Sequence, residues 1–116
     1  MTTVSTPITG TVVVEMVAGD TSPTPIPHAT SHTVVIAENI QNSPNPDNEH
    51  LELPTGAAIG DLVEIYSIRP ASGNNGGVNV YPASGETIRR LTTHVGGAEF
   101  LFRKISATEW RVLVAK

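Results

Sequence analysis

The chain has 116 residues, a formal net charge of −4 at pH 7 and no cysteine. Its length predicts one domain with a modest core. Aromatic residues make up only 4% of it, so valine and isoleucine must fill most of that core. The negative charge argues against nucleic acid as the main partner. The absence of cysteine excludes disulfides, thiolate metal sites and cysteine nucleophiles.

The hydropathy pattern predicts neither a membrane span nor an export signal. No apolar run approaches the ~20 residues that cross a bilayer. Residues 1–10 lack the basic and apolar regions of a secretory signal. We therefore expect no membrane partner, and synthesis in a cytoplasm without export.

The two halves of the chain differ in charge. All of the basic residues follow residue 68: Arg69, Arg89, Arg90, Arg103, Lys104, Arg111 and Lys116. An acidic N-terminal half beside a basic C-terminal half would guide packing between neighbouring subunits. Ordinary solvated surface charge is the alternative interpretation.

The N-terminal third predicts an arm, a strand and a connector. Residues 1–10 are rich in threonine and serine and predict a flexible arm or an edge strand. Residues 11–17 (TVVVEMV) predict a strand, because β-branched side chains suit a pleated surface. Prolines at 23, 25 and 27 predict an extended surface connector, because proline removes a backbone donor and cannot lie centrally in a sheet.

The middle of the chain predicts three further strands. They cover residues 33–40, 50–53 and 62–68, separated by a loop at 42–48 and a connector at 54–61 that has room for one helical turn. Along the third strand, the alternation places Leu62, Glu64, Tyr66 and Ile68 on one face and Val63, Ile65 and Ser67 on the other.

The C-terminal part predicts a meander that ends in a hairpin. Residues 69–77 form a glycine- and asparagine-rich loop, followed by a strand at 78–81, a turn at 82–86, a short strand or bend at 87–91 and the final hairpin. Alternation places Trp110, Val112 and Val114 on one face of the last strand. Both faces of this hairpin are partly apolar and need cover, one from the core and the other from another subunit.

Taken together, about seven or eight short strands predict an all-β fold. We expect a small antiparallel β-sandwich or barrel, jelly-roll-like, with residues 1–10 as an extended N-terminal arm and residues 11–116 as a single β-domain.

No motif for catalysis or metal binding is evident. The sequence lacks nucleophile and phosphate-binding signatures. His28 and His32 are spaced for pairing on a helix, but they follow prolines and precede a strand. Convergence with His50 or His94 in space stays open as an alternative. We expect neither enzymatic activity nor a cofactor.

Residues 53–116 resemble a β-module that recurs in structural proteins of tailed bacteriophages. The matching segments are LPTGAAIGDLV at 53–63, VNVYP at 78–82, SGETI at 84–88, FLFRK at 100–104 after a Gly-Gly pair, and EWRVL at 109–113. They cover a little over half of the chain, and each segment by itself is common.

The resemblance implies a virion component, usually a homotrimer. One placement is a capsid decoration (cement) protein on the outer capsid surface, bound to the major capsid protein and made in the host cytoplasm. The other is a head-fibre, tail-fibre or tail-spike tip that binds a host receptor or glycan. A short chain that begins at Met1 favours decoration. In that role, the arm would add as a strand to a neighbouring sheet.

The residues expected at the interface with the capsid or another subunit come from three places. They are Thr2, Thr3, Val4 and Ile8 in the arm, Arg69, Asn74 and Asn75 in the 69–77 loop, and Arg89 and Arg90 as partners for acidic patches.

Overall fold

The computed structural model describes residues 3–5, 11–16, 23–28, 30–39, 49–68, 77–89, 94–95 and 99–115. Within these ranges all regular secondary structure is β-strand, arranged in two sheets. The prediction of an all-β fold is confirmed.

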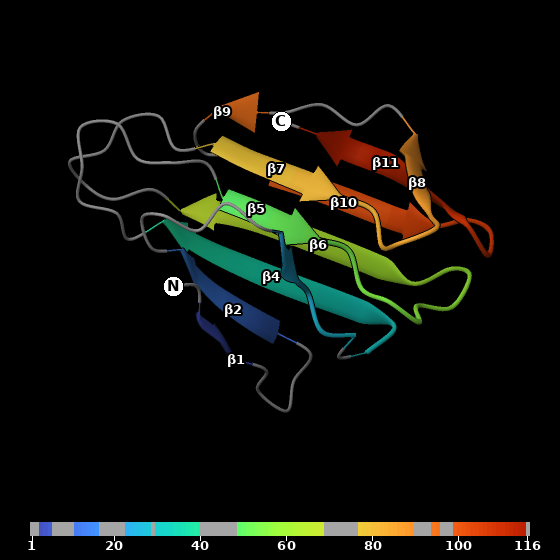
Figure 1. Ribbon diagram of the computed structural model, residues 1–116, viewed down its shortest axis with the longest axis horizontal. Helices are drawn as coiled ribbons and strands as arrows, with labels where there is room; N and C mark the ends of the chain where they lie inside the picture. Colours follow the sequence, from blue (N-terminus) through green and yellow to red (C-terminus); the bar gives the residue numbers. More distant parts are fainter. Residues whose placement is uncertain are drawn as a thin grey trace.

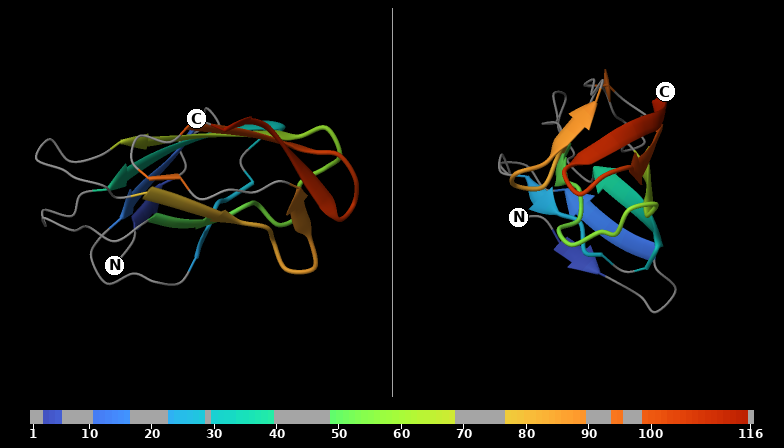
Figure 2. Two further views of the ribbon diagram at one scale, coloured as in Figure 1. Left: turned by 90° about the horizontal axis from the view of Figure 1, so that it is seen from above. Right: turned by 90° about the vertical axis from the view of Figure 1, so that its right-hand side faces the viewer.

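The two sheets form two layers (Figures 1 and 2). The larger sheet contains, in spatial order, β1 (Thr3–Ser5), β2 (Thr11–Met16), β4 (His32–Asn39), β6 (Leu62–Ile68), β10 (Glu99–Lys104), β11 (Glu109–Ala115) and β8 (Thr87–Arg89). The smaller sheet contains β3 (Thr24–Pro25), β5 (Glu49–Glu52), β7 (Gly77–Tyr81) and β9 (His94–Val95).

The chain alternates between the layers as it winds. Strands β2, β4 and β6 are parallel neighbours in the larger sheet, and β3, β5 and β7 are parallel neighbours in the smaller one. Each crossover between parallel neighbours in one sheet therefore contains a strand of the other sheet. The winding resembles that of a β-solenoid. It ends where β10 pairs antiparallel with β6 and β11 pairs antiparallel with β10.

The prediction of purely antiparallel pairing is therefore wrong, because the sheets are mixed. Strand β8 is also parallel to its neighbour β11, whereas β1 and β9 pair antiparallel. Turn signals at short spacing suggested hairpins between successive strands. Parallel neighbours instead need a crossover of roughly a dozen residues or more, and here the crossovers carry the strands of the opposite layer.

The core lies between the two layers. Its buried side chains come from both sheets and from the segments that connect them: Ile26, Val35, Ala37, Leu51, Leu53, Val63, Ile65, Val80, Phe100, Phe102 and Trp110. Phe100 and Phe102 stack with ring centroids 5.5 Å apart. The predicted alternation along β6 is confirmed for Val63 and Ile65, which are buried.

A β-bulge corrects the predicted face of Val114. The register between β10 and β11 shifts between Leu101 and Phe102, so that Leu101 pairs with Val114 and Phe102 with Val112. The extra residue reverses the alternation along β11. Trp110 and Val112 therefore pack on the core, whereas Val114 lies with Leu101 on the outer face.

Two N-terminal segments form edge strands. Thr24 and Pro25 form β3 at the edge of the smaller sheet, where the missing donor of Pro25 interrupts no central ladder. Thr3–Ser5 form β1, which pairs with β2 of the same chain. For Thr3–Ser5, the structure thus favours the edge-strand interpretation over the flexible arm. The rest of the predicted arm lies outside the described residues.

A buried ion pair joins the turn before β8 to the last hairpin. The Glu86 carboxylate accepts hydrogen bonds from Lys104 Nζ at 2.6 Å and from Trp110 Nε1 at 2.8 Å. The Lys104 side chain is only 2% exposed and its Nζ lies 5.2 Å from the centroid of the Trp110 ring. Glu86 follows a turn in which its N–H donates to Ala83 O and Gly85 has a φ of 81°, a conformation that favours glycine.

Two opposing effects act on the pKa of Glu86. Burial raises it, but the hydrogen bonds from Lys104 and Trp110 and the positive charge of Lys104 outweigh burial. The net result is a pKa below the ordinary value, so the ionised carboxylate is the stable form in the folded protein.

We predict that Glu86→Gln destabilises the fold by about 3 kcal/mol, because it leaves the Lys104 ammonium buried without a counter-charge. Urea unfolding followed by circular dichroism measures the change. The matched control is Glu109→Gln, since Glu109 pairs with Arg111 at 3.7 Å and both side chains are about one-third exposed or more. That change should cost less than about 1 kcal/mol. Equal losses in the two variants would contradict a structural role for the Glu86 pair.

We also predict that the wild-type free energy of unfolding falls as the pH drops below 4.5, the ordinary pKa of Glu86. The unfolded carboxyl binds a proton at a higher pH than the folded one. The stability from the ion pair is therefore present above 4.5 and is lost as the pH falls towards the lower folded value. Urea titrations at several pH values should show a weaker pH dependence in Glu86→Gln than in Glu109→Gln. An identical dependence in both would contradict the prediction.

Candidate functional site

The outer face of the larger sheet, here called the large face, carries a belt of partly buried apolar side chains. The alternation that buries Val35, Val63 and Ile65 turns their neighbours outward. The outward apolar residues include Val34 and Ile36 on β4, Leu62 on β6, Leu101 on β10 and Val114 on β11. No described element packs against this face, and in the left view of Figure 2 this sheet forms one surface of the molecule.

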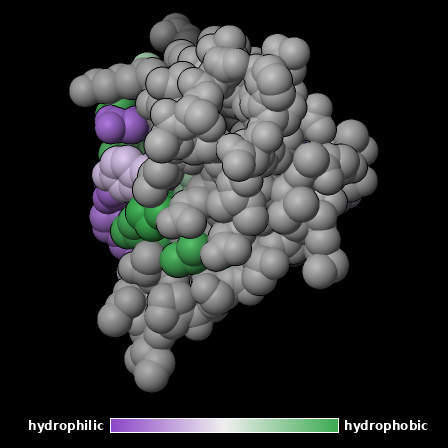
Figure 3. Space-filling model, turned by 90° about the vertical axis from the view of Figure 1, so that its left-hand side faces the viewer, coloured by the Kyte–Doolittle hydropathy of each residue, from purple (hydrophilic) through white to green (hydrophobic). Residues whose placement is uncertain are grey.

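Strand register places several of these residues in one row. Val34 on β4 pairs with Glu64 on β6, Glu64 pairs with Leu101 on β10, and Leu101 pairs with Val114 on β11. A shallow depression of about 190 Å³ lies here, lined by Glu64, Tyr66, Glu99, Phe100, Leu101 and Val114. Figure 3, in which the larger sheet lies towards the left edge, shows hydrophilic and hydrophobic residues side by side.

A polar link lies within the belt. The Tyr66 hydroxyl donates to Glu64 Oε2 at 2.5 Å, and His32 Nε2 lies 2.5 Å from Glu64 Oε1. The Tyr66 hydrogen bond lowers the pKa of Glu64, and with the bond and charge of His32 it outweighs the upward effect of burial. The pKa of Tyr66 is raised because its proton is held by the carboxylate. A carboxylate with a lowered pKa is a weak base, so this site is poorly suited to proton transfer.

A second histidine–carboxylate pair holds the connector that follows β3. His28 Nε2 lies 2.8 Å from Asp61 Oδ2, which also accepts the Ala58 N–H at 2.9 Å. Asp61 is buried. His28 and His32 thus each pair with a different carboxylate. Within the described ranges no group of three or more potential ligands could hold a metal ion.

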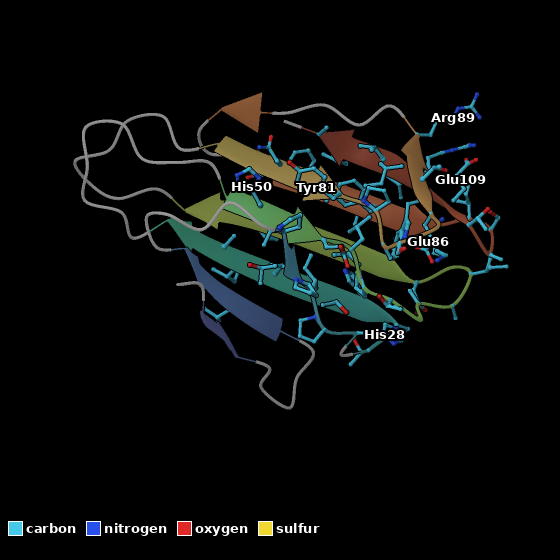
Figure 4. All side chains as sticks on the ribbon, in the orientation of Figure 1. His28, His50, Tyr81, Glu86, Arg89 and Glu109 are labelled. Atoms are coloured by element: carbon cyan, nitrogen blue, oxygen red, sulfur yellow. The ribbon has the colours of Figure 1, made fainter. Side chains whose placement is uncertain are left out.

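The outer face of the smaller sheet, here called the small face, carries a polar aromatic cluster. His50 on β5 and Tyr81 on β7 stack with centroids 6.1 Å apart, and Figure 4 shows the two side by side. His50 Nδ1 lies 3.3 Å from the Tyr81 hydroxyl and 3.4 Å from Asn79 Nδ2. Asn79 Oδ1 is buried and has no hydrogen-bond partner among the described residues. Glu52 lies opposite Tyr81 in the ladder.

The sequence-predicted interface residues are only partly placed. Thr3 and Val4 lie in β1, and Arg89 is exposed at the end of β8. The others lie outside the described residues: Thr2, Ile8, Arg69, Asn74, Asn75 and Arg90. Thr3, at the opposite edge of the sheet from Arg89, does not join it in one site.

Sequence reasoning missed the small-face cluster. It also missed the alignment of Arg89 with Arg111 and Arg103 on neighbouring strands. Alternation in HLEL and VNVY already places His50 and Tyr81 opposite the core residues Leu51 and Val80. That signal identifies the face but not the partner strand. Only the parallel register of β5 and β7 brings the two rings together.

Comparison with known proteins assigns no family. No protein-family model matches this sequence, and no curated protein matches it. Among the described residues, no helix has the length and apolarity required to cross a membrane.

Proposed function

We propose that this protein is a non-catalytic structural module that associates with copies of itself through the large face and attaches to a larger protein shell. The phage resemblance makes the outer surface of a capsid the first shell to test, with the major capsid protein as partner and a homotrimer as the expected assembly. Within this proposal, the two layers are those of a β-sandwich, with the jelly-roll pattern replaced by the solenoid-like winding.

One observation carries the proposal. Parallel sheets occur almost only with both faces covered, and such strands are apolar on both faces. Strands β2, β4 and β6 are parallel. On the outer side of β4 and β6, Val34, Ile36 and Leu62 are apolar, whereas His32, Glu64 and Tyr66 form the polar link there. The core covers one face, and the described residues leave the other without cover.

The composition supports a second copy as that cover. With few aromatic residues, the core of this chain is modest. Burial of apolar surface between copies would add about 25 cal/mol for each Å² removed from water. A closed assembly of identical chains also covers the same face on every copy.

We predict that the purified protein is oligomeric at micromolar concentration and that Leu101→Lys shifts it towards monomer. At the contact between copies, lysine in the middle of the belt would take a charge out of water, and the carboxylate of its neighbour Glu64 is already held by Tyr66 and His32. Light scattering after size exclusion measures the mass. The matched control is Ile59→Lys, which makes the same chemical change at a residue that is 69% exposed in the turn before β6 and is not part of the belt. It should keep the wild-type mass.

Two outcomes would contradict this. If the wild type is monomeric at all accessible concentrations, the protein does not self-associate. If both variants dissociate equally, the large face is not the site of self-association. Co-sedimentation with undecorated capsids tests the attachment step separately. Wild type and Ile59→Lys should bind, and Leu101→Lys should bind more weakly because it loses the avidity of an oligomer.

The small-face cluster favours a second candidate function, a fibre-tip module that binds a receptor or glycan. Tyrosine is enriched at binding surfaces, because its ring is apolar and its hydroxyl can hydrogen bond. Tyr81 is 37% exposed, and the amide of Asn79 and the imidazole of His50 lie beside it.

If that function holds, the protein gives a glycan-array signal that Tyr81→Ala abolishes. Tyr66→Ala, which removes the same side chain from the large face, should leave the signal unchanged. No signal for the wild type would exclude glycans as the ligand of this cluster.

A further inference from the structure

We propose that Arg89, Arg103 and Arg111 form a docking site for an acidic segment of a protein partner, a stretch rich in aspartate and glutamate. This inference is independent of self-association through the apolar belt. We call the three residues the arginine row.

The strand register places these residues side by side. Arg111 on β11 pairs with Arg103 on β10 on one side and with Arg89 on β8 on the other. Cross-strand partners project from the same face of a sheet. Their neighbours in sequence, Phe102, Trp110 and Ile88, pack on the core, so the arginines project outward. Neighbouring strands are about 4.8 Å apart, so the backbone positions of the row span about 10 Å.

The guanidinium groups are exposed and mostly unpaired. All three arginines are exposed, and Figure 4 shows Arg89 pointing away from the body of the protein. Within the described part of the chain, the single ion pair of the row joins Arg111 to Glu109 at 3.7 Å, with both side chains partly exposed. The nearby Lys104 is not part of the row, because it is buried against Glu86.

Such a row has no evident structural benefit. Like charges directly opposite one another in a sheet are destabilising. The chain has only seven lysines and arginines, yet three of them occupy adjacent strands at one level of the sheet. Positions that lower stability are retained where they serve function. An anionic ligand would convert this repulsion into attraction.

The chemistry of the row favours carboxylates on a peptide. Guanidinium groups bind carboxylates bidentately, and arginine is enriched at protein interfaces for that reason. A nucleic acid is less suited, because the whole chain carries a net charge of −4 and would repel a polyanion at long range. The described aromatic ring nearest the row along β11, Trp110, is fully buried and offers no stacking surface for bases.

The support beneath the row is rigid. Thr87 N–H donates to Thr108 O at 2.8 Å, and Trp110, next to Arg111, is held by Glu86. The backbone of the three strands is thus fixed before any ligand arrives. Preorganisation of this kind reduces the entropy lost on binding.

The probe is a fluorescein-labelled peptide of alternating glutamate and serine, with the glutamine–serine peptide as its neutral counterpart. Binding to the full chain is followed by fluorescence anisotropy at low and high salt. We expect the acidic peptide alone to bind, with an affinity that falls at high salt. In Arg103→Gln/Arg111→Gln its affinity should fall about tenfold. The double variant Pro23→Glu/Thr55→Glu lowers the net charge by the same two units at exposed residues beside strands of the smaller sheet and should bind like wild type.

A thermal melt separates docking from a structural role. Because the variant removes like-charge repulsion, its Tm should equal or exceed that of wild type. If it does not fold, Arg103→Lys/Arg111→Lys replaces it, since this variant keeps the charge but loses bidentate binding and should bind the peptide more weakly than wild type.

Several results would overturn the proposal. They include undiminished peptide binding in the Arg103/Arg111 variants, an equal loss in the Pro23/Thr55 control, tighter binding of an oligothymidylate than of the peptide, and a lowered Tm that accounts for the loss. The proposal would also be overturned if the wild type bound no peptide while the Arg103/Arg111 variants changed the oligomer mass, because the row would then serve contacts between copies.

Discussion

The Glu86 carboxylate is the interaction on which the C-terminal half of the fold depends. It joins a turn, the end of β10 and the beginning of β11 by hydrogen bonds to a buried ammonium and a buried indole. Removing the Glu86 carboxylate would leave the Lys104 ammonium and the Trp110 indole N–H buried without this acceptor. This network fixes where Trp110 lies in the core, and with it the short edge strand β8 beside β11. The position of every exposed residue on β8 and β11 follows from that placement.

A second constraint is the winding of the N-terminal half. Because the chain crosses between layers after each strand, β2, β4 and β6 become parallel neighbours, as do β3, β5 and β7. A few strands wound in this way expose two broad sheet faces rather than a closed barrel. The ends are completed by antiparallel strands, β1 on one side and β10 and β11 on the other. The fold therefore offers surfaces more readily than it offers a cleft.

The two surfaces differ in chemistry. The large face combines an apolar belt with the satisfied Glu64 carboxylate and ends in the arginine row. The small face presents the stacked rings of His50 and Tyr81 beside the amide of Asn79. The carboxyl groups of Glu64 and Glu86 each have a lowered pKa, and each is held by hydrogen-bond donors. Such groups stabilise and position neighbouring residues, which agrees with the proposed role in recognition and assembly.

Sequence alone determined the strands and much of the core. Strand positions followed from runs of β-branched residues: the predicted strand at 62–68 coincides with β6, and the last strand of the predicted hairpin is β11. Alternation correctly placed Val63 and Ile65 on the same face of β6, because side chains on a strand point to opposite faces whatever the partner strand is, and the structure shows that both are buried. Proline at 25 correctly excluded a central strand, because the missing donor is a local property.

Tertiary structure alone decided strand order, direction and the composition of each surface. Turn residues show where a strand ends but not which sheet the chain enters next, so the parallel pairing could not be inferred. The bulge at Leu101 moved Val114 to the outer face, because the extra residue is detectable only against its partner strand. For the same reason, Arg89 could be named from sequence, whereas its alignment with Arg111 depends on the parallel pairing of β8 with β11, and the alignment with Arg103 on the register of the final hairpin.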